Sequence, residues 1–177
     1  DPPFVPTEVH LLTTREGAER AQLSLLDPRT GWFHRLRRDY HLPEIAFDAE
    51  RVQVLQGAGG GPLDDIRSPA DNAAAADGIT DRVRALTGDP HCAVHASIAG
   101  GRKTLGFYLG YALSLYGRPQ DRLSHVLVSA PFESHYQFFY PTPTGEVIYT
   151  PPPDSRPLDT AEAEVTLADR KSTRLNS

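Results

Sequence analysis

The sequence predicts an α/β protein with a Rossmann-like arrangement, in which helices cover both faces of a parallel sheet. Two observations support this fold class: short apolar runs alternate with segments of helical periodicity, and glycine or proline separates most of these segments. Strands that alternate with helices form βαβ units, and the parallel sheets built from such units are buried on both sides. At 177 residues, the chain is long enough for one domain with its own core.

In the first half of the chain, the pattern predicts a strand over residues 8–14 and helices over 15–27 and 31–42. A strand over 45–57 and a helix over 69–88 follow. Pro28 and Gly31 separate the two neighbouring helices. Ser68 and Pro69 are a favourable N-cap and first residue for the last helix.

In the second half, the pattern predicts a strand over residues 92–100 and a long apolar helix over 102–117. A strand over 122–131 and one hairpin within 138–159 follow. Gly106 and Gly110 recur along the helix. A glycine in a helix interior costs stability, so this helix is expected to pack closely against a sheet or another subunit. The prolines that follow residue 150 indicate a linker or a domain edge.

Composition and charge limit the classes of partner. The net charge of −5 argues against a broad electrostatic grip on DNA, so we expect any anionic ligand to be small and bound locally. No run approaches the roughly 18 apolar residues of a membrane span, and we expect no membrane association. The single cysteine, Cys92, excludes an internal disulfide and suits a cytoplasmic location.

One segment between a strand and a helix is the main candidate site. This glycine loop, residues 97–104, offers Ser97, Gly100, Gly101, Arg102, Lys103 and Thr104 as ligand-binding residues. In an open parallel sheet, ligands bind beyond the carboxyl ends of the strands, where the next helix presents free N–H groups. Two glycines permit close approach of the backbone, and two cations add charge, so the pattern predicts a phosphate site. A tight turn with solvated cations is the alternative.

Two familiar phosphate motifs do not fit this loop. A P-loop requires Gly-x-x-x-x-Gly-Lys-Ser/Thr, and Ser97 and Arg102 occupy its two glycine positions. The Gly-x-Gly-x-x-Gly fingerprint of dinucleotide sites is also missing. The loop therefore supports neither ATP hydrolysis nor NAD binding, and we expect no cofactor.

Residues after the strand at 122–131 are further candidates. Glu133, Ser134 and His135 directly follow a strand end, where they can line a ligand pocket. The aromatic run 135–140 can stack adenine bases or cover a sheet edge. His95 and His125 are expected to be structural. We expect no metal site, because turns and helix capping explain Asp64, Asp65 and Asp71.

Several separated blocks resemble one protein family in the same order. They are SIAGGRKTLGFYLGYALSLYGRPQDRLSHVLVS, PFVPTEVHLLTTREGAERA, GWFHRLRRDY and PLDDIRSPADNAAAADGIT. Over residues 3–169, the chain resembles the CRISPR-associated Rossmann-fold (CARF) sensor proteins, specifically the branch of CRISPR-associated ring nucleases. The resemblance implies a homodimer that binds a cyclic oligoadenylate across the dimer and cleaves this antiviral messenger. Lys103, between Arg102 and Thr104, matches the family's basic residue at the ring phosphates.

The resemblance also sets expectations about the chain's extent. Residues 1–150 are expected to be a CARF-type sensor domain that lacks its first strand and helix, together with the phosphate-facing loop after that strand. Residues 151–169 are expected to be a proline-rich linker or the start of a further region. The final RKSTRLNS, residues 170–177, resembles translated sequencing-adapter sequence and is interpreted as a non-native tail.

The leading hypothesis is a metal-independent ring nuclease of type III CRISPR systems, with cyclic tetra-adenylate as the expected ligand. A ribose 2′-OH attacks the adjacent phosphate, and Lys103 and Arg102 act catalytically by stabilising the developing charge. One alternative is a non-catalytic sensor domain that controls a C-terminal effector such as a ribonuclease. Another is a nucleotide-binding α/β domain of unrelated purpose.

Overall fold

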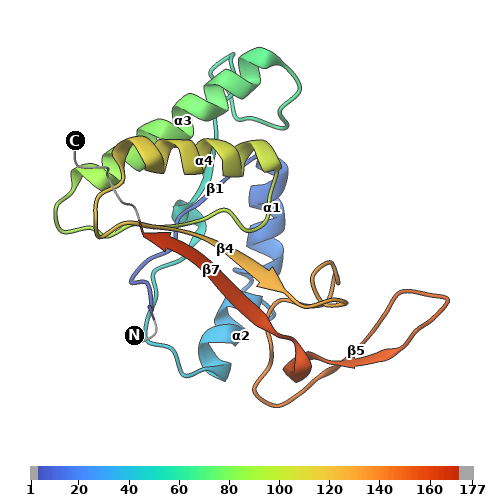
Figure 1. Cartoon of the computed structure of the whole chain (residues 1–177). Helices are drawn as coiled ribbons and strands as arrows, with labels where there is room; N and C mark the ends of the chain where they lie inside the picture. Colours follow the sequence, from blue (N-terminus) through green and yellow to red (C-terminus); the bar gives the residue numbers. More distant parts are fainter. Residues whose placement is uncertain (1–3, 172–177) are drawn as a thin grey trace. The chain divides into compact units, whose positions relative to one another are not determined.

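The computed structural model describes residues 4–171 and has a mixed α/β fold, as the sequence predicts. The described helices are α1 (Arg15–Ser24), α2 (Trp32–Asp39), α3 (Pro69–Gly88) and α4 (Lys103–Tyr116), with the 3-10 turns η1 (Ala49–Arg51) and η2 (Thr160–Glu162). The strands are β1 (Leu11–Thr13), β2 (Val52–Val54), β3 (His95–Ser97), β4 (Arg122–Val128), β5 (Val147–Tyr149), β6 (Pro157–Asp159) and β7 (Val165–Lys171). They form three small sheets, β1-β2, β3-β4-β7 and β5-β6 (Figure 1).

The described residues divide between two compact units. Unit 1 consists of the described residues within Asp1–His10, Glu19–Val52 and Leu127–Thr166. Unit 2 consists of the described residues within Leu11–Ala18, Gln53–Val126 and Leu167–Ser177. Helices α3 and α4 and the glycine loop belong to unit 2. Helix α2 and the β5-β6 hairpin belong to unit 1.

Unit 2 contains the βαβ element that carries the glycine loop. Strands β3 and β4 pair in parallel, with His95 opposite Arg122 and Ser97 opposite Ser124, and α4 connects them. The N–H of Ile98 donates to the Ser124 carbonyl at 2.9 Å and so extends the pairing into the loop. This βαβ unit agrees with the sequence pattern. The three small sheets do not by themselves show the continuous parallel sheet of a Rossmann-like fold.

Helices α3 and α4 lie side by side and enclose the core of unit 2 (Figure 1). Ala75, Ile79 and Val83 recur every four residues, so one stripe of α3 is buried. The core cluster consists of these three with Leu55, Leu63, Ala96, Ala112 and Leu113. A Cβ added to Gly110 would lie 3.6 Å from Leu123, so α4 packs closely on the sheet, as its glycines predict.

The start of α3 follows the sequence prediction. The Ser68 hydroxyl accepts from the N–H of Asp71 at 3.0 Å, and Pro69 occupies the first helical position. This cap satisfies one of the four N–H groups that a helix leaves unpaired at its start.

Other elements differ from their predicted extents. The strand predicted over 8–14 is limited to β1, and Glu8 makes an isolated bridge to Ala46. In the region 45–57, the Asp48 side chain accepts from the N–H of Arg51, which favours η1 and leaves only β2 as strand. The hairpin predicted within 138–159 is present as β5 and β6.

The C-terminal part of the described chain contains a strand that the pattern does not predict. β7 pairs beside β4, although Ala168 and Asp169 are poor strand formers. The segment 151–169 contains β6, η2 and the first part of β7. Of the predicted tail, residues 172–177 lie outside the described residues. Within the described part of the chain, no helix has the length and apolarity to cross a membrane.

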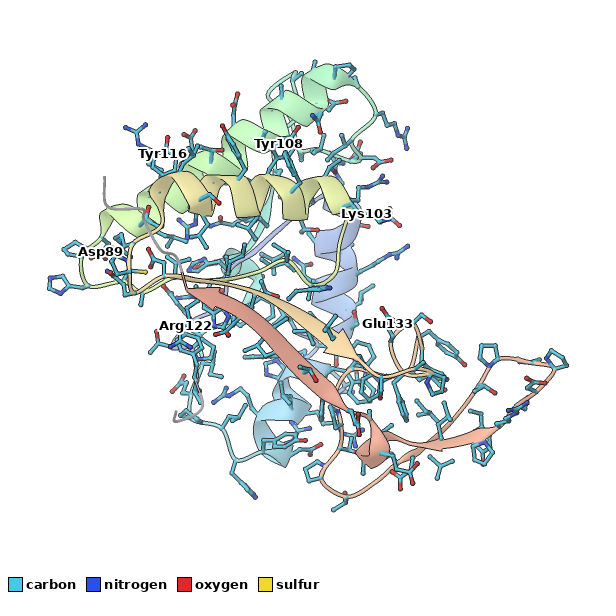
Figure 2. All side chains as sticks on the ribbon, in the orientation of Figure 1. Asp89, Lys103, Tyr108, Tyr116, Arg122 and Glu133 are labelled. Atoms are coloured by element: carbon cyan, nitrogen blue, oxygen red, sulfur yellow. The ribbon has the colours of Figure 1, made fainter. Side chains whose placement is uncertain are left out.

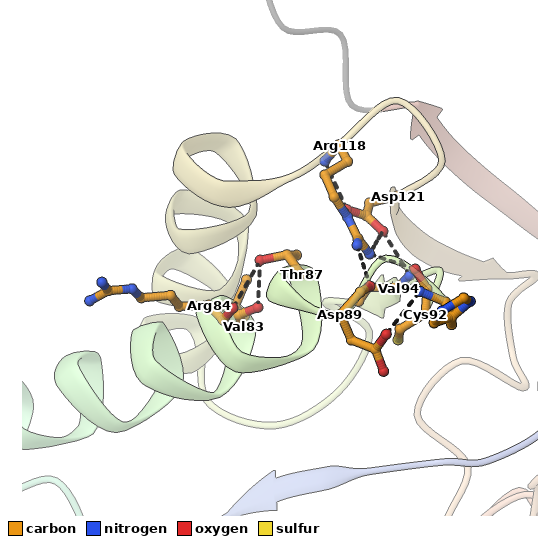
Figure 3. A network of polar contacts seen from close by, with 9 residues as sticks. Val83, Arg84, Thr87, Asp89, Cys92, Val94, Arg118 and Asp121 are labelled. Atoms are coloured by element: carbon orange, nitrogen blue, oxygen red, sulfur yellow. Dashed lines mark hydrogen bonds and ion pairs between the residues drawn. The ribbon is translucent and has the colours of Figure 1, made fainter.

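A buried ion pair connects the end of α4 to the strands beside it (Figure 3). The Asp121 carboxylate is fully buried and accepts from the backbone N–H groups of Val94 and Arg118, each at 2.8 Å. The Arg118 guanidinium donates to Asp121 at 2.9 Å and to the carbonyls of Asp89 and Cys92. Burial alone would raise the pKa of Asp121, but these hydrogen bonds outweigh it and lower the pKa below its ordinary value.

We expect Asp121→Ala to destabilise the protein by about 3 kcal/mol, because it leaves the Arg118 guanidinium without its carboxylate and two backbone N–H groups without an acceptor. Urea denaturation measures the change. The control is Asp154→Ala, which removes an exposed ion pair with Arg156 at 3.6 Å and should cost less than about 1 kcal/mol. Equal effects of the two substitutions would contradict this role of Asp121.

Candidate functional site

The glycine loop joins the end of β3 to the start of α4 in unit 2. Gly100 and Gly101 have φ angles of +81° and +71°, a left-handed conformation that other residues adopt only with strain. No heavy atom outside the adjoining chain lies within 4 Å of a Cβ added at either position. The glycines are therefore required by the turn rather than by close packing, and the loop backbone stays open to a ligand.

The first turn of α4 has no side-chain cap. Its N-cap residue, Arg102, has extended backbone angles and makes no capping hydrogen bond. Lys103 and Thr104 follow as the first residues of the helix, and their side chains are exposed. Figure 2 shows Lys103 at this end of α4. The partial positive charge of a helix N-terminus and the Lys103 ammonium therefore lie together.

The two cations of the loop differ in their surroundings. The Arg102 guanidinium makes an ion pair with Asp65, whose carboxylate also lies 3.5 Å from Nε of Arg67. Lys103 makes no ion pair within the described part of the chain. Arg102 is thus partly neutralised and oriented, whereas Lys103 presents a full charge to solvent.

Ser97 contributes to the shape of the loop. Its hydroxyl accepts from the N–H of Ala99 at 3.3 Å, which turns the chain directly after β3. Beside it, Nε2 of His95 lies 2.8 Å from the Ser124 hydroxyl. Burial, followed by the charge of Arg122, lowers the pKa of His95 and so favours the neutral ring.

The acidic residues before α3 have local partners. Asp64 makes an exposed ion pair with Arg15 at 2.9 Å, and Asp71 accepts from the Ser68 hydroxyl at 2.8 Å. The hydrogen bond from Ser68 is the main cause of the lowered pKa of Asp71. Asp71 thus takes part in the cap of α3, whereas Asp64 makes a surface ion pair.

The other predicted ligand residues belong to unit 1. Glu133 and Ser134 are exposed in the turns that follow β4. His135 is buried, and its ring lies within hydrogen-bond distance of the Tyr149 carbonyl and of the N–H of Gln137. The structure therefore brings together Ser97 and residues 100–104 in one unit, and Glu133, Ser134 and His135 in the other.

Asp65 is the residue at the glycine loop that sequence reasoning did not connect with it. The sequence places it 37 positions before Arg102, in a turn-rich segment where acidic residues are common. Only the opposite charges of the two segments signal this pairing, and many other pairs in the chain have opposite charges.

Comparison with known proteins identifies one family. The sequence model of the family described as CRISPR-associated protein NE0113 matches residues 4–175. No curated protein and no solved structure matches the chain.

We expect Gly101→Ala to destabilise the protein by about 1–2 kcal/mol, because alanine must adopt the left-handed conformation of this position. The control is Gly59→Ala, at a position with equally open surroundings and no left-handed φ. Urea denaturation of both variants measures the difference. Equal stability of the two variants would show that the loop relaxes to another conformation.

Proposed function

This chain belongs to the family of CRISPR-associated protein NE0113, and we propose that it binds a cyclic oligoadenylate at the glycine loop and cleaves it as a ring nuclease. The proposal combines the family membership with the CARF resemblance of the sequence. The observation that carries it is the position of Lys103, a cation that makes no ion pair within the described residues, in the uncapped first turn of α4 and two positions after the left-handed Gly101. Open N–H groups and a positive charge at one helix end suit a phosphate group.

The proposed reaction uses the ligand's own nucleophile. A ribose 2′-OH loses its proton to solvent and attacks the neighbouring phosphorus. The bond to the 5′-oxygen of the next nucleotide breaks, this oxygen takes a proton from solvent to become a 5′-hydroxyl, and a 2′,3′-cyclic phosphate remains. Lys103 stabilises the charge that develops on the phosphate oxygens, and the loop N–H groups assist it. Alignment of the 2′-OH with the departing oxygen supplies the remaining acceleration. This route requires no metal or cofactor.

The ion pair between Arg102 and Asp65 influences how a phosphate enters the loop. An arriving phosphate competes with the Asp65 carboxylate for the Arg102 guanidinium. Because Asp65 also approaches Arg67, it can turn toward that side chain when Arg102 moves to the ligand. In this proposal, an arriving phosphate therefore contacts Lys103 first and Arg102 second.

A homodimer is part of the proposal, and the exposed face of α4 supports it. Phe107, Tyr111 and Leu115 recur every four residues and are 67%, 56% and 48% exposed. Lys103 is the only charged residue in this helix. An apolar helix face of this kind is typical of a surface that another protein covers. A two-fold axis beside it would offer the same residues to opposite phosphates of a symmetric ring.

A non-catalytic sensor that controls an effector is the second candidate. The observation that favours it is the ion pair of Arg102 with Asp65, because a cation held by a carboxylate contributes less to a developing negative charge. Binding without cleavage would follow if Lys103 alone engaged the ring.

We expect Lys103→Ala to weaken the binding of cyclic tetra-adenylate about tenfold or more, because it removes one charge-assisted contact to phosphate. Cleavage should slow by about 100-fold if the same charge stabilises the transition state. Calorimetry measures binding, and chromatography of linear products in the presence of EDTA measures cleavage.

The matched control is Arg84→Ala, which removes an exposed cation from α3 in the same unit. It should change neither quantity. Binding of the ring without linear products would favour the sensor, and equal effects of both substitutions would remove the argument for a dedicated loop.

We expect Tyr111→Arg to shift the protein toward monomers and to weaken ring binding, since it places a charge within the apolar face of α4. Sedimentation velocity measures the oligomeric state. An unchanged state would exclude this face as the dimer contact.

A further inference from the structure

An open cavity lies within unit 1, and its lining residues are separate in the chain from those of the glycine loop. It has a volume of about 390 Å³, and we call it the aromatic groove; it is lined by Trp32, Tyr136, Gln137, Phe139, Glu146 and Tyr149. We propose that the aromatic groove binds a single nucleobase, with adenine as the best match. Its volume lies near the lower end of the range for small-molecule sites, which suits one nucleoside rather than a whole oligonucleotide.

The rings of the groove divide into a packed pair and two exposed faces. Trp32 stacks on Phe139 with centroids 4.5 Å apart, and the Arg35 guanidinium lies 5.0 Å from the Trp32 ring centroid. Tyr136 and Tyr149 are 72% and 55% exposed. Both rings line the groove, so each offers a face to a planar ligand there. These two rings are therefore the stacking surfaces that the groove offers to a planar ligand.

A buried histidine contacts both exposed tyrosines, one at the tyrosine ring and the other at the tyrosine backbone. Nδ1 of His135 accepts from the N–H of Gln137 at 3.2 Å, so the ring proton is on Nε2, which donates to the Tyr149 carbonyl at 2.9 Å. The His135 ring also stacks on Tyr136 at 5.2 Å. One imidazole thus connects the turn that carries Tyr136 with strand β5. The Tyr136 ring and the backbone of β5 at Tyr149 are therefore held before a ligand arrives, which lowers the entropic cost of binding.

The polar side chains of the groove favour a ligand that donates hydrogen bonds. The Glu146 carboxylate only accepts, and Arg35 pairs with Oε1, one of its two oxygens. The Gln137 amide both donates and accepts, the combination that matches N6 and N7 of adenine. A proline-rich peptide also stacks on aromatic grooves, but it has few N–H groups to offer a carboxylate. An adenine amino group meets this requirement.

The test uses a feature of the composition. Trp32 is the only tryptophan of the chain, so its fluorescence reports on the groove. We expect titration with adenosine to change this fluorescence saturably. Tyr149→Ala should weaken the binding about fivefold or more, because it removes one stacking ring, whereas Tyr149→Phe should keep it. The control Leu23→Ala, which removes an exposed apolar side chain from α1 in the same unit and outside the groove lining, should have no effect.

Further arms separate this proposal from the proposed function. Adenosine has no phosphate, so Lys103→Ala should leave the binding of adenosine unchanged. This expectation holds whether or not the glycine loop binds a phosphate. If cyclic tetra-adenylate also changes the fluorescence, with the same sensitivity to Tyr149→Ala, the groove takes a base of the ring; a response to adenosine alone assigns it to free nucleosides. No saturable response to adenosine, an equal response to a polyproline peptide, or full binding by Tyr149→Ala would overturn the proposal.

Discussion

The buried carboxylate of Asp121 is the constraint on which the geometry of unit 2 depends. It accepts from the N–H of Val94, directly before β3, and from the N–H of Arg118, two residues after the end of α4. The next residue, Arg122, donates its N–H to the Val94 carbonyl at 2.8 Å, so the register of β3 against β4 begins at this point. The position of the glycine loop at the other end of β3 therefore follows from a hydrogen-bond network around one side chain.

The same network explains how α4, an apolar helix, is held at one position along its axis. Its buried face contacts α3 and the sheet through small and aliphatic side chains, which favour burial but do not specify a unique position along the helix axis. Polar anchors supply this specificity. Arg118 fixes the chain after the end of the helix, and Tyr108 accepts a hydrogen bond from Asn72 of α3 near its middle.

Local signals could be predicted from the sequence, and long-range pairings could not. The cap of α3 by Ser68, the βαβ element and the β5-β6 hairpin depend on neighbouring residues, whose spacing is visible in the chain. β7 pairs at the edge that β4 offers, although Ala168 and Asp169 within it are poor strand formers. The run 135–140 indicated an aromatic cluster, but its partner Trp32 lies about a hundred positions earlier, and no periodicity connects the two.

The pairing of Arg102 with Asp65 has a consequence for the ions around the molecule. A cation that faces open solvent attracts small anions, and their release favours the binding of a polyanion at low salt. Arg102 already has a counterion in the form of the protein's own carboxylate. If a phosphate binds as proposed, Arg102 would exchange the Asp65 carboxylate for the phosphate and release few ions into solution. The steepness with which salt opposed such binding would then report on Lys103 far more than on the total number of cations in the loop.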